Sequence, residues 1–276
     1  IIFRNPPKAM TALSININKI ALIRNSRPGN YPDVAAYAEK CINLGADGIT
    51  VHPRPDQRHI RPNDVRDISK IISELDGVEF NVEGNPFADQ NGDYPGLLKL
   101  VKQTRPDQCT LVPDELDQLT SDHGFDLDAF GKTLKPVIEE IKSFGTRVSL
   151  FLDPDPYQIK NAARLGADRI ELYTGPYASA WGCEELKNIH KQHGNAAKLA
   201  NSLGLGVNAG HDLNLENLAH YATIEHLLEV SIGHAFTVDS LSMGLRQSME
   251  ADRSLLSRPQ AYEIKMRHRT KSPNQI

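Results

Sequence analysis

Short apolar segments recur about every thirty residues along the chain, and most of them end in a polar or ionisable residue. Continuous apolar runs of this length are typical of buried parallel strands. The pattern predicts eight strands, over residues 13–18, 48–52, 79–83, 108–112, 147–153, 169–173, 206–211 and 228–234.

The segments between these runs have the spacing of amphipathic helices. After a Pro-Asn-Asp start at 62–64, apolar residues recur at Val65, Ile68, Ile72 and Leu75. Several such segments end at a glycine directly before a strand, where the left-handed conformation at a helix end is needed. We expect helices over residues 32–44, 62–75, 94–104, 127–144, 156–165 and 184–203.

One helix–strand junction is repeated within the chain. Residues 44–52 (LGADGITVH) resemble residues 165–173 (LGADRIELY). Repeated helix–strand units build a parallel sheet. No GxGxxG turn follows the first strand, so a closed (β/α)8 TIM barrel is favoured over an open doubly wound sheet.

Length and composition fit one such barrel. The 276 residues are 39% hydrophobic and 24% charged, typical of a soluble globular protein. A net charge of −4 argues against a partner that is nucleic acid or an anionic membrane. We expect an N-terminal extension over 1–10, a single barrel domain over 11–257 and a polar, basic C-terminal tail over 258–276.

The cysteines and apolar runs bear on localisation. Cys41, Cys109 and Cys183 stand apart without a CxxC pair, which fits a reducing compartment, and the first two are expected to be buried apolar residues. No run approaches the roughly 20 apolar residues of a membrane span, and the first ten residues lack a signal-peptide core. We therefore expect a cytoplasmic protein.

Four ionisable residues lie in or just beyond predicted strands: His52, Glu83, Glu171 and His211. The carboxyl ends of barrel strands meet at one face, so these side chains are expected to converge there. Two carboxyl groups and two imidazoles in one pocket can shift each other's pKa values, which suits acid–base catalysis in several steps. Each of them alone could equally be a hydrogen-bonded core residue.

A second group of residues suits anions. Arg54, Arg58 and His59 lie in the loop after the second strand, and Arg24 and Arg27 follow the first. Arginine forks match phosphate oxygens, so a phosphorylated substrate is one interpretation and a surface salt-bridge cluster is the other.

The pairs Gly-His at 210–211 and 233–234 follow the seventh and eighth strands, where barrels often hold phosphate on backbone N–H groups. Three histidines, at 52, 211 and 234, could also ligate a metal ion. The first strand lacks a His-x-His pair and the chain has no HExxH motif, so no metal is expected. Lys19, just beyond the first strand, could form a Schiff base with a carbonyl substrate, or point outward.

Taken together, these motifs resemble the pyridoxine 5′-phosphate synthase family, over about residues 13–249. The segments that carry the resemblance are 16–27, 48–60, 81–83, 111–113, 148–153, 170–175, 207–211 and 231–234. The chain departs from the family pattern at two places. It has Asn18-Lys19 where many members have Asp-His, and Asp212 where many have Gly.

The resemblance implies a (β/α)8 barrel with extra helices, assembled as a homo-octamer, that needs no metal or organic cofactor. It implies a transferase-class condensation of 1-deoxy-D-xylulose 5-phosphate with 3-amino-2-oxopropyl phosphate to give pyridoxine 5′-phosphate, phosphate and water. The loop over 113–125 would act as a lid over the site.

The resemblance also implies residue roles. His52 and Glu83 would accept protons, His211 would donate one, and Glu171 would stabilise a transition state. Residues implied in holding the amino phosphate are Asn16, Gly233 and His234. Those implied in holding the deoxyxylulose phosphate are Arg54, His59 and Thr120, with Arg27 nearby. Of the departing positions, Asn18 and Lys19 stand at a sugar-phosphate contact, and the Asp212 carboxylate stands where it could crowd a phosphate.

Two other functions remain open at this point. One is a phosphosugar aldolase or isomerase that uses Lys19, and the other is a non-catalytic scaffold that binds phosphorylated metabolites.

Overall fold

The computed structural model describes residues 10–257. Most of the expected N-terminal extension and the whole of the expected basic tail, at 1–9 and 258–276, lie outside the described residues.

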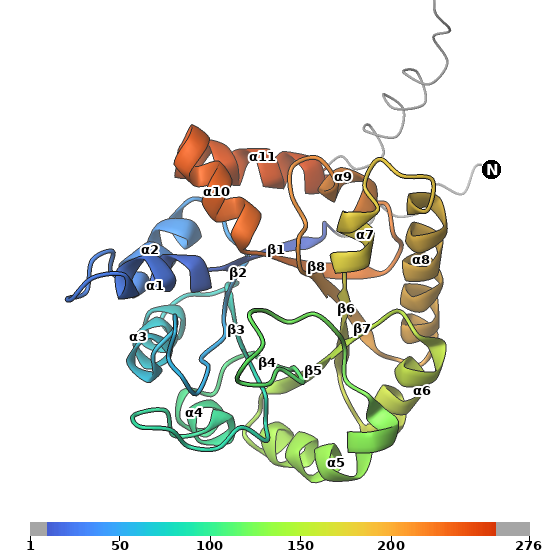
Figure 1. The fold of residues 1–276 in the computed structure, drawn as a ribbon, viewed down its shortest axis with the longest axis horizontal. Coiled ribbons are helices and arrows are strands. Elements are labelled where there is room, and N and C mark those ends of the chain that lie inside the picture. The colour runs from blue at the N-terminus through green and yellow to red at the C-terminus, as the bar shows by residue number, and fades with distance from the viewer. Residues whose placement is uncertain (1–9, 258–276) are drawn as a thin grey trace, which may run out of the picture.

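Eight parallel strands close into a barrel in sequence order, with β8 pairing back to β1, as predicted (Figure 1). The strands are β1 Ala12–Asn16, β2 Gly48–Val51, β3 Glu79–Gly84, β4 Gln108–Leu111, β5 Arg147–Leu152, β6 Arg169–Tyr173, β7 Gly206–Gly210 and β8 Leu227–Ile232. Each falls within two residues of its predicted range.

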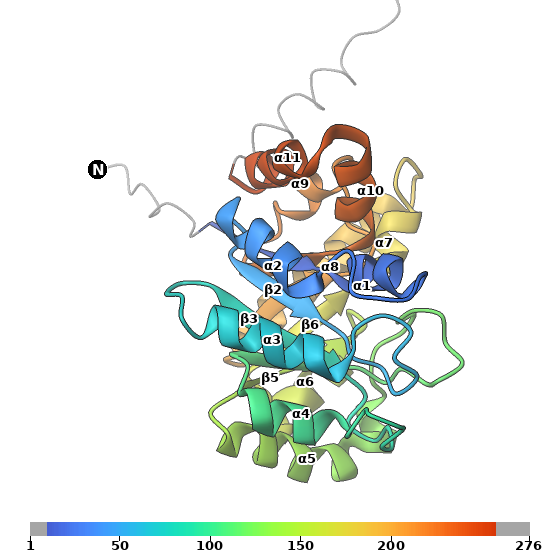
Figure 2. The same cartoon turned by 90° about the vertical axis from the view of Figure 1, so that its left-hand side faces the viewer.

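Helices surround the barrel, and the loops after β2 and β4 emerge at the same end of it (Figure 2). The expected helices are confirmed as α2 Val34–Asn43, α3 Pro62–Ile72, α4 Leu97–Thr104, α5 Leu127–Ser143, α6 Pro156–Leu165 and α8 Leu186–Ser202. Further helices are α1 Asn18–Asn25, α7 Gly175–Ser179, α9 Leu218–Tyr221, α10 His234–Met243 and α11 Leu245–Ser257. Across residues 10–257, none of these helices has the length and apolar character needed to cross a bilayer.

The apolar core lies between the strands and the helices, not inside the barrel. Ile49 and Val51 of β2 face outward into this core, whereas Thr50 between them is buried among polar side chains. Thr50 Oγ1 lies 2.8 Å from Ser14 Oγ and 3.4 Å from Asn81 Nδ2. The strands therefore alternate between an apolar outer face and a polar inner face, which the prediction of continuously apolar strands had missed.

Two element boundaries differ from the prediction in ways that affect the site. β1 ends at Asn16, and Asn18 begins α1, so Lys19 lies in the first turn of a helix and not at the end of a strand. Asn16 Oδ1 accepts the backbone N–H of Asn18 at 3.0 Å, which turns the chain at this point. α4 begins only at Leu97, because Pro95 and the positive φ of Gly96 interrupt the helical backbone before it.

Candidate active site

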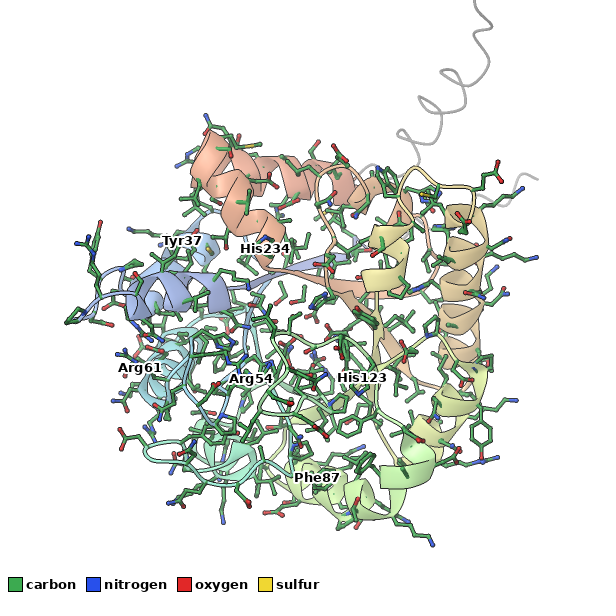
Figure 3. All side chains as sticks on the ribbon, in the orientation of Figure 1. Tyr37, Arg54, Arg61, Phe87, His123 and His234 are labelled. Carbon is green, nitrogen blue, oxygen red and sulfur yellow. The ribbon has the colours of Figure 1, made fainter. Side chains whose placement is uncertain are left out.

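The four ionisable residues at the strand ends converge as predicted. His52, Glu83, Glu171 and His211 line one cavity of about 350 Å³ at the mouth of the barrel. The cavity is also lined by every residue expected to bind substrate except Arg27, namely Asn16, Asn18, Lys19, Arg54, His59, Thr120, Asp212, Gly233 and His234. In Figure 3, Arg54 and His123 lie over the middle of the barrel, and His234 lies at the start of α10.

The turn after β1 connects two walls of this cavity. Asn18 Oδ1 accepts the backbone N–H of His52 at 2.9 Å, so α1 holds the end of β2 in place. Asn16 Nδ2 lies 3.5 Å from Glu83 Oε2, which links β1 to β3. These amides therefore position the two residues expected to accept protons.

The two carboxyl groups are buried, with Glu83 9% and Glu171 4% exposed. Burial, followed by the charge of Glu229, raises the pKa of Glu171 to about 8, against a hydrogen bond from Thr110. Burial, followed by the charges of Glu171 and Asp114, raises the pKa of Glu83 well above its usual range. Glu171 is therefore largely protonated at neutral pH, and burial favours the protonated form of Glu83 as well.

The two histidines of the loop after β2 are held neutral. Burial, followed by the charges of Arg54 and Arg58, lowers the pKa of His52 to about 3. Burial, followed by the charge of His52, lowers the pKa of His59 to about 3 as well. A neutral His52 can accept a proton, although the nearby cations make it a weak base.

On the opposite side of the cavity, three side chains form a hydrogen-bonded row. Thr120 Oγ1 lies 2.7 Å from His211 Nε2, and His211 Nδ1 lies 3.0 Å from Asp212 Oδ2. His211 and Asp212 both have positive φ, at 90° and 58°, which turns both side chains out of the end of β7. Asp tolerates this left-handed region better than most residues, so the backbone at position 212 does not require glycine.

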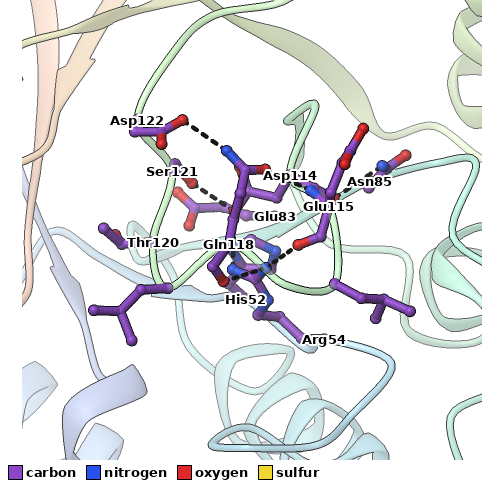
Figure 4. Close-up of polar contacts among 12 residues, drawn as sticks. His52, Arg54, Glu83, Asn85, Asp114, Glu115, Gln118, Thr120, Ser121 and Asp122 are labelled. Atoms are coloured by element: carbon purple, nitrogen blue, oxygen red, sulfur yellow. Dashed lines mark hydrogen bonds and ion pairs between the residues drawn. The ribbon is translucent and has the colours of Figure 1, made fainter.

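The loop over 113–125 closes one side of the cavity and is held there by arginines (Figure 4). Arg54 donates to Asp114 Oδ2 at 3.1 Å and to the backbone oxygens of Glu115 and Gln118, at 2.5 and 3.0 Å. Arg58 donates to the backbone oxygens of Gln118 and Leu116, at 2.8 and 2.6 Å. The guanidinium groups of Arg54 and Arg58, which were expected to suit a phosphate, therefore bind this loop in the structure.

Arg24 and Arg27, the two arginines that follow β1, have surroundings different from those of Arg54 and Arg58. Arg24 is buried and donates to Asp64 Oδ1 at 2.5 Å and to the backbone oxygen of His59 at 3.1 Å, so it matches the salt-bridge interpretation. Arg27 is exposed and is not among the residues that line the cavity. Its proposed contact with substrate remains a prediction.

Sequence reasoning missed several residues of the cavity, above all Asp114, Ser121 and Phe151. Asp114 carried a usable signal, because it lies three residues beyond the carboxyl end of β4, at the end of the barrel where the other ionisable residues gather. Ser121 and Phe151 had no such signal in the sequence, since nothing in their spacing distinguishes them from ordinary loop and core residues.

Within residues 10–257, no three side chains of His, Cys, Asp or Glu come together in a way that could hold a metal ion. His52, His211 and His234 all line the cavity but do not form such a group.

Comparison with known proteins identifies the family. Residues 13–258 match the family described as pyridoxal phosphate biosynthesis protein PdxJ. The chain belongs to this family of biosynthetic enzymes. It is 55% identical over 242 residues to pyridoxine 5′-phosphate synthase of Xanthomonas axonopodis pv. citri, covering 87% of this chain and 94% of that protein. It is 52% identical over 238 residues to the enzyme of the same name from Xylella fastidiosa, covering 85% and 90%.

Solved structures support the fold alone. A tryptophan synthase structure from M. tuberculosis matches with a TM-score of 0.56 at 12% identity, covering 90% of this chain and 94% of that one. Phosphoribosyl anthranilate isomerase from Thermus thermophilus matches with a TM-score of 0.53 at 16% identity, covering 90% and 98%.

Proposed function

We propose that the protein condenses 1-deoxy-D-xylulose 5-phosphate with 3-amino-2-oxopropyl phosphate to form pyridoxine 5′-phosphate, phosphate and water. The observation that carries this proposal is the convergence of His52, Glu83, Glu171 and His211 in one cavity. Membership of the family and the names of its relatives support pyridoxine 5′-phosphate as the product.

Two sides of the cavity suit the two phosphate groups. On one side, α10 begins at His234 with Gly233 as its N-cap, so backbone N–H groups and the helix dipole favour an anion there. A side chain at position 233 would lie 3.0 Å from Asn16 Cβ, so glycine keeps this approach open. On the other side, Arg54 and His59 are the proposed ligands of the deoxyxylulose phosphate.

The proton-transfer groups match the steps of the proposed reaction. The amine must add to a ketone, water and phosphate must leave, and a carbon–carbon bond must close the ring, so each step moves protons. His52 and Glu83 are the proposed acceptors, His211 the donor and Glu171 the transition-state stabiliser. Burial favours the protonated form of Glu83, and a cationic amine bound beside it would favour its carboxylate form.

The direct test is to incubate the purified protein with both phosphorylated substrates and assay for pyridoxine 5′-phosphate, with a chelator control. We expect product from the wild type and losses of ~100-fold or more in His211→Ala and Glu83→Gln. Full activity in either variant would overturn the assigned roles. Substrate binding without any product in the wild type would favour the scaffold, and a borohydride-trapped adduct on Lys19 would favour the aldolase.

We also propose that the protein assembles with copies of itself, as the family resemblance implies for an octamer. Apolar side chains are exposed on two neighbouring helices that both begin at the cavity, Leu22 and Ile23 on α1 and Val238 and Leu241 on α10. Leu241 is 77% exposed, which is unfavourable unless another surface covers it. Analytical ultracentrifugation should detect an oligomer that Leu241→Asp weakens; a monomeric wild type would contradict the proposal.

A further inference from the structure

Asp114 is a buried carboxyl group at the centre of the loop contacts, and no role has been assigned to it above. Its side chain is 3% exposed. It follows β4, and its backbone oxygen accepts a hydrogen bond from Asn85 Nδ2 at 3.0 Å, so the loops after β3 and β4 both hold it. Figure 4 shows it among His52, Arg54, Glu83 and Ser121.

The two oxygens of this carboxyl group have different surroundings. Oδ2 accepts hydrogen bonds from Arg54 at 3.1 Å and from Ser121 Oγ at 2.8 Å, and it lies 4.0 Å from His52 Nδ1. Oδ1 is buried and has no hydrogen-bond partner among the described residues. One oxygen is thus shared between the proposed phosphate ligand Arg54 and the proposed base His52.

The hydrogen bonds of Arg54 determine how a phosphate at this residue would affect Asp114. Among residues 10–257, its guanidinium donates hydrogen bonds to the loop over 113–125 through Nη1 and Nη2, so a phosphate that binds at this end of the guanidinium competes with that loop for the same N–H groups. Replacement of the Asp114 contact would leave that carboxylate buried without its strongest cationic partner, which is costly unless another positive charge takes its place.

We propose that Asp114 is a positioning residue that couples phosphate binding at Arg54 to proton acceptance by His52. This inference rests on the proposed function. In the structure, Arg54 binds the Asp114 carboxylate. When a phosphate takes over Arg54, Asp114 turns to His52 Nδ1–H, and His52 Nε2 accepts the proton from the substrate. The imidazolium that forms is then balanced by the Asp114 carboxylate.

The charges that act on Asp114 and His52 include those that a bound phosphate would change. Burial raises the pKa of Asp114, although Ser121 and Arg54 oppose the rise. His52 is kept neutral by burial and by Arg54 and Arg58, the same cations that a phosphate would neutralise. The ionisable groups around His52 are Arg54, Asp56, Arg58 and His59 on its own loop, Asp114 from the loop after β4, and Glu83 from β3. Only Asp114 among them is within ion-pair distance of the ring.

The test compares Asp114→Asn with Asp117→Asn, which removes the same charge from an exposed position of the same loop. NMR titration of the His52 ring is recorded with and without saturating inorganic phosphate. In the wild type and in Asp117→Asn, we expect phosphate to raise the pKa of His52 by about one unit or more. In Asp114→Asn we expect most of that rise to be lost, and Asp114→Glu should restore part of it.

Steady-state kinetics provide the second measurement. Asp114→Asn should lower kcat by ~10- to 100-fold with little change in KM for the deoxyxylulose phosphate, and should alter the acidic limb of the pH profile. If Asp114 had a merely structural role, Asp114→Asn would lower the melting temperature and leave the acidic side of the pH–rate profile unchanged. The inference is overturned if phosphate shifts the His52 titration equally in Asp114→Asn, or leaves it unchanged in the wild type.

The two measurements separate this inference from the proposed function. The NMR titration needs no turnover, so an inactive wild type would overturn the proposed reaction and leave the coupling to be judged from the titration. If Asp114→Asn does not fold, the wild-type titration decides, since a His52 pKa that phosphate leaves unchanged contradicts the coupling.

Discussion

At the scale of single residues, the cavity depends on ionisable side chains that the barrel removes from water. Burial is the largest cause of two pKa shifts: it raises the pKa of Glu171 and lowers the pKa of His52. Each side chain therefore favours its neutral form. Lys19 differs from them, because it lies in the first turn of α1 at the edge of the cavity and is only partly buried. A partly buried ammonium group suits the binding of an anion more than the formation of a Schiff base.

We therefore expect Lys19→Met to weaken substrate binding and to leave catalysis in place. KM for a phosphorylated substrate should rise by roughly tenfold, corresponding to the loss of one charged contact of about 1.4 kcal/mol, whereas kcat should change by less than about threefold. Steady-state kinetics with each substrate varied in turn would measure this. A loss of kcat to background, together with a borohydride adduct in the wild type, would instead identify Lys19 as a covalent catalyst.

At the scale of secondary-structure elements, the strand ends place the reactive groups and the glycines leave room for them. Gly210 is the last residue of β7 and neighbours β6 in the barrel. A Cβ atom at position 210 would lie 2.3 Å from Glu171 Oε1, which is closer than any van der Waals contact allows. The position of the Glu171 carboxyl group thus requires glycine on the adjacent strand.

Gly210→Ala should accordingly displace the Glu171 carboxyl group and lower kcat by ~10-fold or more, while the barrel still folds. Circular dichroism and kinetics would be measured together. Gly194→Ala is the matched control, because position 194 lies inside α8 with no atom near its Cβ, and alanine favours a helix by up to about 1 kcal/mol. Wild-type kinetics in Gly210→Ala would show that Glu171 can move without consequence.

The elements themselves were largely predictable from the sequence. Apolar periodicity and terminal glycines predicted all eight strands and the helices α2, α3, α4, α5, α6 and α8, because both signals depend on local backbone geometry. The short helices α7 and α9 and the two C-terminal helices α10 and α11 were not predicted. The short helix α1 was missed, since Asn16 and Asn18 end β1 through side-chain contacts that do not alter the hydrophobic pattern.

At the scale of the whole molecule, buried carboxyl groups make stability depend on pH. Asp252 of α11 is 1% exposed, and burial, followed by the charge of Asp239, raises its pKa to about 7. The unfolded chain releases this proton near pH 4, whereas the folded protein retains it until about pH 7. The contribution of Asp252 to stability is therefore full below about pH 4 and is lost as the pH rises toward 7.

Asp252→Asn should remove this part of the pH dependence. Relative to the wild type, the variant should gain stability as the pH rises from 5 to 7, by on the order of 1 kcal/mol per pH unit at most. Urea unfolding at several pH values would measure the difference. Glu250→Gln, which removes an exposed carboxylate from the same helix, should show no such gain, and parallel pH curves for Asp252→Asn and the wild type would contradict the assignment.

By itself, the sequence determined the (β/α)8 architecture, the family, and the set of ionisable residues at the strand ends. These depend on local periodicity and on motifs that are read along the chain. Only the tertiary structure decided which groups each side chain contacts. Arg54 binds the loop over 113–125 and Arg24 binds Asp64, although both were expected to suit anions. The polar interior of the barrel and the position of Asp114 were decided in the same way, because contacts between residues far apart in sequence depend on how the strands close and the loops fold over them.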